Sequence, residues 1–424
     1  MSAPLAPEPS RPRYHGYVMV GVAVAAMICT LPGQTIVVSQ FNEPIRAALD
    51  LSLREISLAY LIGTALAALP LTLVGKAADR LGLRVVVGAV ALSFALALCL
   101  LGQARGFLSL TAGFALVRFL GQGSLGMLSS HILAMWFERR LGVMESIKHV
   151  GFSLATLVLP ALTVALIGAL GWRRALVVLG LGVASVLLPL VATVFRDRPE
   201  DLGQRLDGDL PPAEGEPEAP AAADPAFTLG EAVRTRALWT LLASGPYLGL
   251  VGTAMLFHTQ PILASLGVED PKAWAPYVQA PWPIALTLTP LFSGWLADNV
   301  DARWLVPAGL TLAALSCACL AVANQGGLAP TSWFALSMAV FGVAMGVMIS
   351  AVGPTIARYF GRAHHGAIRG LSLSIGVAAT ATGPFLLSEG AHLAGGGFDR
   401  VFAVFACAAV PLALAGLTLR RPQK

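Results

Sequence analysis

A few charged side chains lie inside long apolar stretches of the chain, where a charge requires a partner, water or a ligand. Arg118 lies about ten residues into an apolar run that begins at residue 108, which is ~15 Å along a helix at ~1.5 Å per residue. Glu145, Lys148 and His149 follow in the next run at helical spacings, so they share one face. A charge at this depth of a bilayer costs several kcal/mol unless it is compensated. These residues are candidates for binding an anion or carrying protons.

Each of these charges has two interpretations. Lys148 either forms an internal ion pair with Glu145, or joins Arg118 in an electropositive cavity for a small carboxylate. Arg118 either takes part in transport, or only donates hydrogen bonds to backbone carbonyls of neighbouring helices. Proton coupling requires a carboxylate or histidine that titrates within the membrane, and Glu145 and His149 are the coupling candidates. His131 and Glu389 are further titratable candidates, and His131, near a helix end, is otherwise interpreted as an interfacial or core residue.

Neutral polar side chains extend the candidate substrate site. Pro32 and Gly33 predict a break in the first apolar run that exposes backbone carbonyls beside Gln34. In the second half of the chain only neutral candidates are assigned, because Arg369, at the start of the eleventh run, is counted with the loop before it. The candidate substrate-binding residues are Gln34, Arg118, Gln122, Lys148, Tyr247, Gln279 and Trp282.

The composition requires that these residues be positioned by membrane-spanning helices. The chain has 424 residues, of which 56% are hydrophobic and 12% charged, against about 25% charged in a typical soluble domain. The mean hydropathy is +0.74, and apolar runs of roughly 20 residues recur, which is the length that spans a bilayer. An all-α polytopic membrane protein is predicted and an ordinary cytosolic enzyme is excluded. Sequence motifs for phosphate, zinc or hydrolase chemistry are absent, so neither enzyme activity nor a cofactor or metal is expected.

Charged residues, glycines and prolines interrupt the apolar runs, and these breaks predict twelve transmembrane helices in two sets of six. The predicted spans are 17–38, 56–74, 85–102, 108–135, 141–168 and 173–195, then 237–263, 276–296, 304–323, 331–357, 367–388 and 399–419. Residues 1–195 and 237–424 are the two halves, and 196–236 is a connecting linker. Its Pro-rich and acidic stretch, DLPPAEGEPEAPAAADP, has almost nothing apolar to bury, so the linker is predicted to be disordered and cytoplasmic.

The distribution of basic residues predicts the orientation. Of the 28 Lys and Arg residues, 19 fall on the tails and even-numbered loops and 7 on the odd-numbered loops, while Arg118 and Lys148 lie within spans. Because Lys and Arg concentrate on the cytoplasmic side, both termini are predicted to be cytoplasmic in a bacterial inner membrane. The net charge of +5 is spread over these loops rather than clustered, so nucleic acid is not expected as a partner.

Three segments of the first half recur in the second half. GKAADRLGLR at Gly75–Arg84 returns as GWLADNVDAR at Gly294–Arg303, at an offset of 219 residues. WFERRLG and GWRRALVVLG return as YFGRAHHG and GFDRVFAVFA at offsets of 223–224 and 226. An even number of spans separates the equivalents, so the halves are parallel six-helix repeats. This architecture is typical of transporters whose substrate site lies at the midplane between the halves.

The Gly75–Arg84 stretch resembles the signature loop between helices 2 and 3 of the major facilitator superfamily, G-x-x-x-D-R-x-G-x-R. The resemblance implies the twelve-helix fold of that family and a loop that acts as a latch for one state of the alternating-access cycle. The second copy has Asn299 and Asp301 at two motif positions, so a weaker latch is expected there. The latch candidates are Gly75, Asp79, Arg80, Gly82, Arg84, Asp298 and Arg303.

A narrower resemblance concerns the start of the fifth span. WFERRLG matches the WF-x-RR-x-G pattern of bacterial relatives of the monocarboxylate transporters and oxalate:formate antiporters at Trp136, Phe137, Arg139, Arg140 and Gly142. The RDRPEDLG stretch after helix 6 matches as well. This resemblance implies a carrier of a small monocarboxylate. A symporter is expected, with protons as the candidate coupling ion.

The sequence therefore predicts a secondary active transporter that moves a small organic anion by alternating access, acting as a monomer in the lipid bilayer. A proton-coupled exporter of hydrophobic or amphiphilic compounds is the alternative, favoured if Arg118 and Lys148 are both paired internally. A non-transporting membrane sensor that has kept the fold is the alternative of another class.

Overall fold

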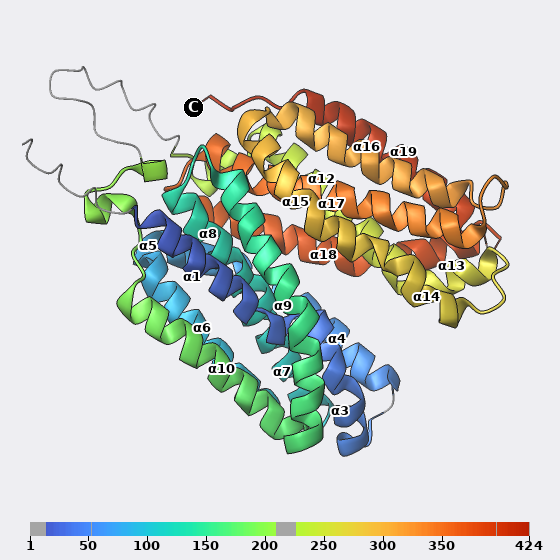
Figure 1. The fold of residues 1–424 in the computed structure, drawn as a ribbon, viewed down its shortest axis with the longest axis horizontal. Coiled ribbons are helices and arrows are strands. Elements are labelled where there is room, and N and C mark those ends of the chain that lie inside the picture. Colours follow the sequence, from blue (N-terminus) through green and yellow to red (C-terminus); the bar gives the residue numbers. More distant parts are fainter. Residues whose placement is uncertain (1–13, 52, 209–225, 396, 424) are drawn as a thin grey trace, which may run out of the picture.

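The computed structural model describes residues 14–51, 53–208, 226–395 and 397–423, which are helical with connecting turns (Figure 1). The first six crossings are α1 (Gly16–Cys29), α4–α5 (Leu53–Ala68 and Leu71–Leu81), α6 (Leu83–Leu101), α7–η3–α8 (Phe107–Val117, Arg118–Leu125 and Gly126–Trp136), α9 (Leu141–Leu170) and α10 (Trp172–Thr193). The second six are α12 (Arg236–Phe257), α15 (Pro281–Asn299), α16 (Ala302–Ala321), α17 (Pro330–Phe360), α18 (His365–Leu393) and α19 (Asp399–Leu417). The predicted twelve-helix fold is confirmed.

Short helices complete the chain around these crossings. They are η1 (Leu31–Gly33), α2 (Thr35–Val38), η2 (Ser39–Phe41), α3 (Asn42–Leu49), η4 (Pro199–Leu202), η5 (Leu206–Gly208), α11 (Leu229–Ala232), α13 (Thr259–Ser265) and α14 (Pro271–Gln279). Ten segments of the described chain are long and apolar enough to cross a membrane as single spans. The other two crossings are the composite α7–η3–α8, which carries Arg118, and α15.

Each half has a hydrophobic core of its own. Phe94, Phe114 and Trp136 are fully buried in the first half, and Phe334 and Phe402 in the second. Large aromatic side chains of this kind supply much of the apolar area that a core buries. Because the cores are separate, each half can keep its internal contacts while its position relative to the other half changes.

The two halves meet on the side of the membrane where both ends of the described chain lie, here named the terminal face. Figure 1 shows the halves drawn together near α5 and α8 and spread apart toward α3 and α14. Glycines permit the close approach, because a Cβ atom on Gly75 would lie 1.9 Å from the carbonyl oxygen of Gly366. A Cβ atom on Gly142 would likewise lie 2.5 Å from the carbonyl oxygen of Gly294. The conformation is therefore closed on the terminal face.

Gly82 makes the turn between α5 and α6 with a φ of 89°, a conformation that side-chain-bearing residues rarely adopt. Arg84 then anchors the turn, because its guanidinium donates to the carbonyls of Val191 and Ala192 at 2.9 and 2.6 Å. The Asp197 carboxylate accepts the backbone N–H of Arg84 at 2.7 Å. These bonds hold the predicted signature loop to its own half.

The predicted linker, 196–236, differs from the structure where it is described. Residues 209–225 lie outside the described residues, but the flanking segments form η4, η5 and α11. The Asp207 carboxylate accepts the backbone N–H groups of Glu138, Arg139 and Arg140 at 3.1, 2.9 and 3.2 Å. Because these donors precede α9 and need acceptors, the first part of the linker is ordered against the first half rather than disordered.

Gly75→Ala is expected to hold the terminal face open, because the added methyl group overlaps the Gly366 carbonyl. The measurement is the reaction rate of Ala134→Cys with a charged thiol reagent, in a chain whose native cysteines are replaced by alanine. Ala134 is 3% exposed here, and the rate should rise at least tenfold. Gly21→Ala is the matched control, since a Cβ atom there meets nothing within 4 Å. Equal protection in both variants would contradict the steric role of Gly75.

Candidate functional site

The fourth crossing changes from an α-helix to a π-helix at Arg118, and this π segment, η3, ends at Leu125. Short π segments widen a helix and are frequent at functional sites. The broken first crossing fits against it, because a Cβ atom on Gly33 would lie 2.7 Å from the carbonyl oxygen of Val117. The predicted break is present as η1, followed by an extended Gln34 with ψ of 150°. The two irregular segments together expose backbone carbonyls beside Arg118.

Arg118 is a buried cation without an anionic partner. Its side chain donates to the Gly33 carbonyl at 3.3 Å and to Thr35 Oγ1 at 3.1 Å. The guanidinium lies 5.0 Å from the centroid of the Tyr60 ring, and the residue is 7% exposed. Nε has no hydrogen-bond partner, and among the described residues no carboxylate forms an ion pair with Arg118. Its charge is stabilised only by neutral dipoles and an aromatic face.

A small cavity beside Arg118 gathers further polar atoms without partners. Its lining comprises Thr64, Ala67, Leu71, Arg118, Gln122, Gly123 and Val377. Thr64 Oγ1 and Gln122 Oε1 are buried without a hydrogen bond, as is Arg118 Nε. Val377 belongs to α18, so the second half closes one side of the cavity. Buried polar groups are normally satisfied, and a convergent unsatisfied set indicates a place for water or a ligand.

The other neutral candidates do not line this cavity. Gln34 donates to Thr30 Oγ1 at 3.2 Å. Tyr247 donates to the Phe405 carbonyl at 2.7 Å and so joins α12 to α19 within the second half. Gln279 donates to Thr259 Oγ1 at 2.6 Å near the opposite face, where Trp282 begins α15 with its Nε1 buried and without a partner.

Lys148 forms an internal ion pair with Glu145. Both side chains are almost fully buried, at 1% and 5% exposure. Lys148 Nζ also donates to Ser130 Oγ at 2.6 Å, which ties α9 to α8. His149 Nε2 lies 3.9 Å from the same carboxylate. In this conformation the charge of Lys148 is compensated by its neighbour.

Arg369 is a second buried cation, and its assignment to a loop is wrong. It lies on α18, one turn after the helix begins at His365. Its Nε is buried without a partner, and its guanidinium lies against Gly353 of α17, where a Cβ atom would be 3.4 Å away. It is close enough to Glu145, Lys148 and His149 to act on their charges. The second half therefore contributes a cation as well as neutral groups.

The repeat in the sequence carried a signal for Arg369. The offset of 224 residues that relates Gly142 to Gly366 also relates Glu145 to Arg369. Equivalent positions of parallel repeats lie around the same pseudo-two-fold axis. On that basis the sequence could have predicted that Glu145, near the start of helix 5, and Arg369, at the equivalent place in helix 11, lie near each other.

Two symmetric contacts, named the first and the second joint, seal the terminal face. At the first joint the Asp79 carboxylate accepts the N–H groups of Gly366 and Ala367, both at 2.9 Å. At the second joint the Asp298 carboxylate accepts the N–H groups of Gly142 and Val143 at 2.7 and 2.9 Å. Each carboxylate thus caps the first turn of a helix from the other half, where free donors and the helix dipole favour an anion.

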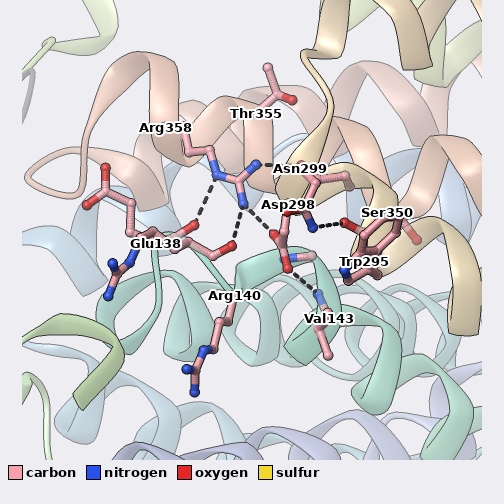
Figure 2. Close-up of polar contacts among 12 residues, drawn as sticks. Glu138, Arg140, Val143, Trp295, Asp298, Asn299, Ser350, Thr355 and Arg358 are labelled. Atoms are coloured by element: carbon pink, nitrogen blue, oxygen red, sulfur yellow. Dashed lines mark hydrogen bonds and ion pairs between the residues drawn. The ribbon is translucent and has the colours of Figure 1, made fainter. Parts of the chain in front are cut away.

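Arg358 adds contacts to the second joint that the expectation of a weaker second latch did not include. Figure 2 shows its guanidinium between the Glu138 backbone and the Asp298 carboxylate, with which it forms an ion pair. It also donates to the carbonyls of Glu138 and Ala297 at 3.0 and 2.6 Å. Arg358 lies outside the signature motif, so the motif alone did not reveal it.

The other latch candidates do not bridge the halves. Arg303 pairs with its neighbour Asp301 at 3.3 Å, and Arg84 binds the end of α10. Arg80 is exposed, and the structure gives it no hydrogen bond or ion pair within the described part of the chain. Gly75, Asp79 and Asp298 therefore make the contacts between halves. Across the same described residues, no three His, Cys, Asp or Glu side chains gather closely enough to hold a metal ion.

Twelve membrane-crossing helices in two parallel halves, with buried charges between them, define a membrane transport protein rather than an enzyme. The Major Facilitator Superfamily model matches residues 18–287 and 282–424, and the chain belongs to this family. No curated protein matches the chain in sequence.

Two solved structures show the same fold. The human organic anion transporter MFSD10 (TETRAN) is 17% identical, with a TM-score of 0.64, over 96% of this chain and 100% of that one. The proton:xylose symporter XylE, bound to 6-bromo-6-deoxy-D-glucose, is 14% identical, with a TM-score of 0.67, over 94% of each chain. Neither similarity bears on the narrower resemblance to monocarboxylate and oxalate:formate carriers.

Lys148→Met alone is expected to lower the free energy of unfolding by about 3–5 kcal/mol, because it leaves Glu145 buried without its counter-charge. The double variant Glu145→Leu/Lys148→Met should recover most of that loss, since no charge then remains unpaired in the pair. Thermal or denaturant unfolding in detergent measures both. If the double variant is no more stable than Lys148→Met alone, the two residues do not act as a unit.

Proposed function

We propose that this protein is a secondary active transporter of a small organic anion, with monocarboxylates as the substrate class. The observation that carries the proposal is Arg118, a buried guanidinium with no carboxylate partner among the described residues. A charge withdrawn from water without a counter-ion is costly, so such sites are normally completed by an anion or by water. Arg118 lines the same cavity as Thr64 and Gln122, whose side-chain oxygens also lack partners.

The donor set suits a carboxylate. A guanidinium presents its N–H groups in a planar fork that matches the two oxygens of a carboxylate. Arg118 retains Nε for this purpose while its NH1 is engaged by Gly33 and Thr35. In this conformation the cavity has a volume of about 10 Å³, which is room for about one water molecule, so a carboxylate must widen it to bind.

The charges between the halves favour an anion over a hydrophobic cargo. Lys148 and Glu145 offset each other, while neither Arg118 nor Arg369 has a carboxylate within ion-pair distance in the described chain. The region is therefore net positive. An apolar cavity and internal pairing of both Arg118 and Lys148 would favour an exporter of hydrophobic compounds, and of these two residues only Lys148 is paired in the described chain. We assign Arg118 to substrate binding and keep Gln122 as its neighbour in the site.

Alternating access follows from the joints. Closure on the terminal face is one state of the cycle, and release of the joints would open that face by rocking residues 1–195 against 237–424. The excess of Lys and Arg on the terminal face supports a cytoplasmic location for that face, in a bacterial inner membrane. One chain contains both halves, so the monomer is the proposed transporting unit.

Protons are the proposed coupling ion, with Glu145 and His149 as the residues that carry them. Glu145 lies between Lys148, His149 and the field of Arg369, so its charge depends on the arrangement of both halves. The human structural neighbour is described as an organic anion transporter, which agrees with an anionic cargo, although a similarity of this degree bears on the fold alone.

Arg118→Gln is expected to lower carboxylate transport by about 10- to 150-fold, because a hydrogen bond to a charged group contributes about 1.5–3 kcal/mol. The measurement is saturable uptake of labelled acetate, lactate and oxalate into proteoliposomes, with and without an inward proton gradient. The gradient should stimulate uptake by the native protein.

Arg105→Gln is the matched control, because Arg105 is exposed at a helix connection and its loss should leave uptake unchanged. Normal uptake by Arg118→Gln would reduce Arg118 to a structural role. No uptake of any carboxylate by folded native protein would favour the exporter of apolar compounds, and no transport of any compound would favour the sensor.

A further inference from the structure

Two histidine rings, one from each half, are buried against each other at the first joint. His131 lies on α8 and His365 begins α18, and their ring centroids are 5.0 Å apart at an interplanar angle of 59°. Each residue is 2% exposed. The Nδ1 atom of each ring is buried without a hydrogen-bond partner. His131 was a titratable candidate in the sequence, but its pairing with a ring of the other half was not predicted.

The second joint contains a permanent cation, Arg358, whereas the first joint contains the two histidines. Arg358 pairs with Asp298 at the second joint. At the offset of 223 residues that aligns Trp136 with Tyr359, Met135 is the residue of the first half that is equivalent to Arg358. Within the described residues no Lys or Arg forms an ion pair with Asp79, and the nearest titratable partner is His131, whose Nε2 lies 3.8 Å from Asp79 Oδ1.

The surroundings allow at most one proton on the pair while the joint is closed. Asp79 of α5 is the carboxylate that faces the rings, and both of its oxygens already accept backbone N–H groups. The other charged groups that act on the joint are basic: Arg198 follows α10, His364 precedes α18, and Arg369 lies on α18. Two charged imidazoles 5.0 Å apart would repel each other with a single carboxylate beside them.

We propose that His131 and His365 form a proton-binding site that controls the first joint. When the halves separate on the terminal face, both rings are exposed to water and can each take a proton. When the halves close, the pair must release at least one of them. The proposal rests on the alternating-access part of the proposed function and does not depend on the chemistry of the cargo.

The sign of the pH dependence follows from proton counting. A histidine in water titrates at about pH 6.5, so below that pH the open joint binds more protons than the closed joint. The equilibrium then shifts toward the open joint by about tenfold per pH unit for each additional proton. Above about pH 7.5 both rings are neutral in either state, and the closed joint is favoured.

Pulsed electron paramagnetic resonance can measure this opening. Spin labels at Leu81→Cys and Trp304→Cys lie on the terminal face of opposite halves, at sites that are 65% and 57% exposed. The native cysteines are replaced by alanine, and no substrate is added. Between pH 7.5 and pH 5.5 the population with the longer distance should grow about tenfold for one proton.

His131→Gln/His365→Gln should abolish this pH response while keeping polar side chains at both positions. His392→Gln, near the other end of α18, is the matched control and should respond as the native protein does. If the double variant does not fold, His131→Gln and His365→Gln alone should each reduce the response.

An unchanged distance distribution in the native protein between pH 7.5 and pH 5.5 would overturn the proposal, and so would a native response in the variants. Because the labelled protein is measured without substrate, a failure of carboxylate uptake would overturn the proposed cargo and leave this result standing.

Discussion

The contact on which the rest of the structure depends is the capping of a helix start in one half by a carboxylate of the other. Asp79 satisfies the N–H groups of Gly366 and Ala367, and Asp298 satisfies those of Gly142 and Val143. The first turn of a helix leaves its N–H groups without intrahelical partners. Each joint therefore satisfies donors that would otherwise be buried without a hydrogen bond. Glycines at the contact allow the backbones to approach closely enough for these bonds to form.

Closure of the joints also decides the environment of every buried charge between the halves. The Glu145–Lys148 pair and Arg369 lie about one to two helical turns above the joints, and Arg118 lies deeper still. A charge that is compensated within its own half, such as Lys148, tolerates this burial in any state. A charge without such a partner, such as Arg118, ties its own stability to what occupies the region between the halves. Closing the joints and filling the central site are therefore coupled, because closure buries charges such as Arg118 whose stability depends on what occupies the site.

Much of the site could be predicted because charges are rare in apolar runs. Arg118, Glu145 and Lys148 stand out for that reason, and the short spacing of Glu145 and Lys148 already indicated the pair that the structure contains. Arg369 was missed because its helix begins only one turn earlier, and a small boundary error moves such a residue into a loop. Tyr247 and Gln279 carry suitable groups, but their hydrogen bonds are made within their own half. The face and depth that a side chain occupies on its helix cannot be read from residue type alone.

By itself, the sequence determined the number of helices, the division into parallel halves and the presence of buried charge, because hydropathy and internal repeats are local properties of the chain. Only the tertiary structure decided which of those charges are compensated. Arg358 is paired with Asp298, His131 lies against His365, and Arg118 has no anionic partner in the described chain. Each outcome depends on the rotation and depth at which helices from distant parts of the chain meet, and a few ångströms separate an ion pair from an uncompensated charge.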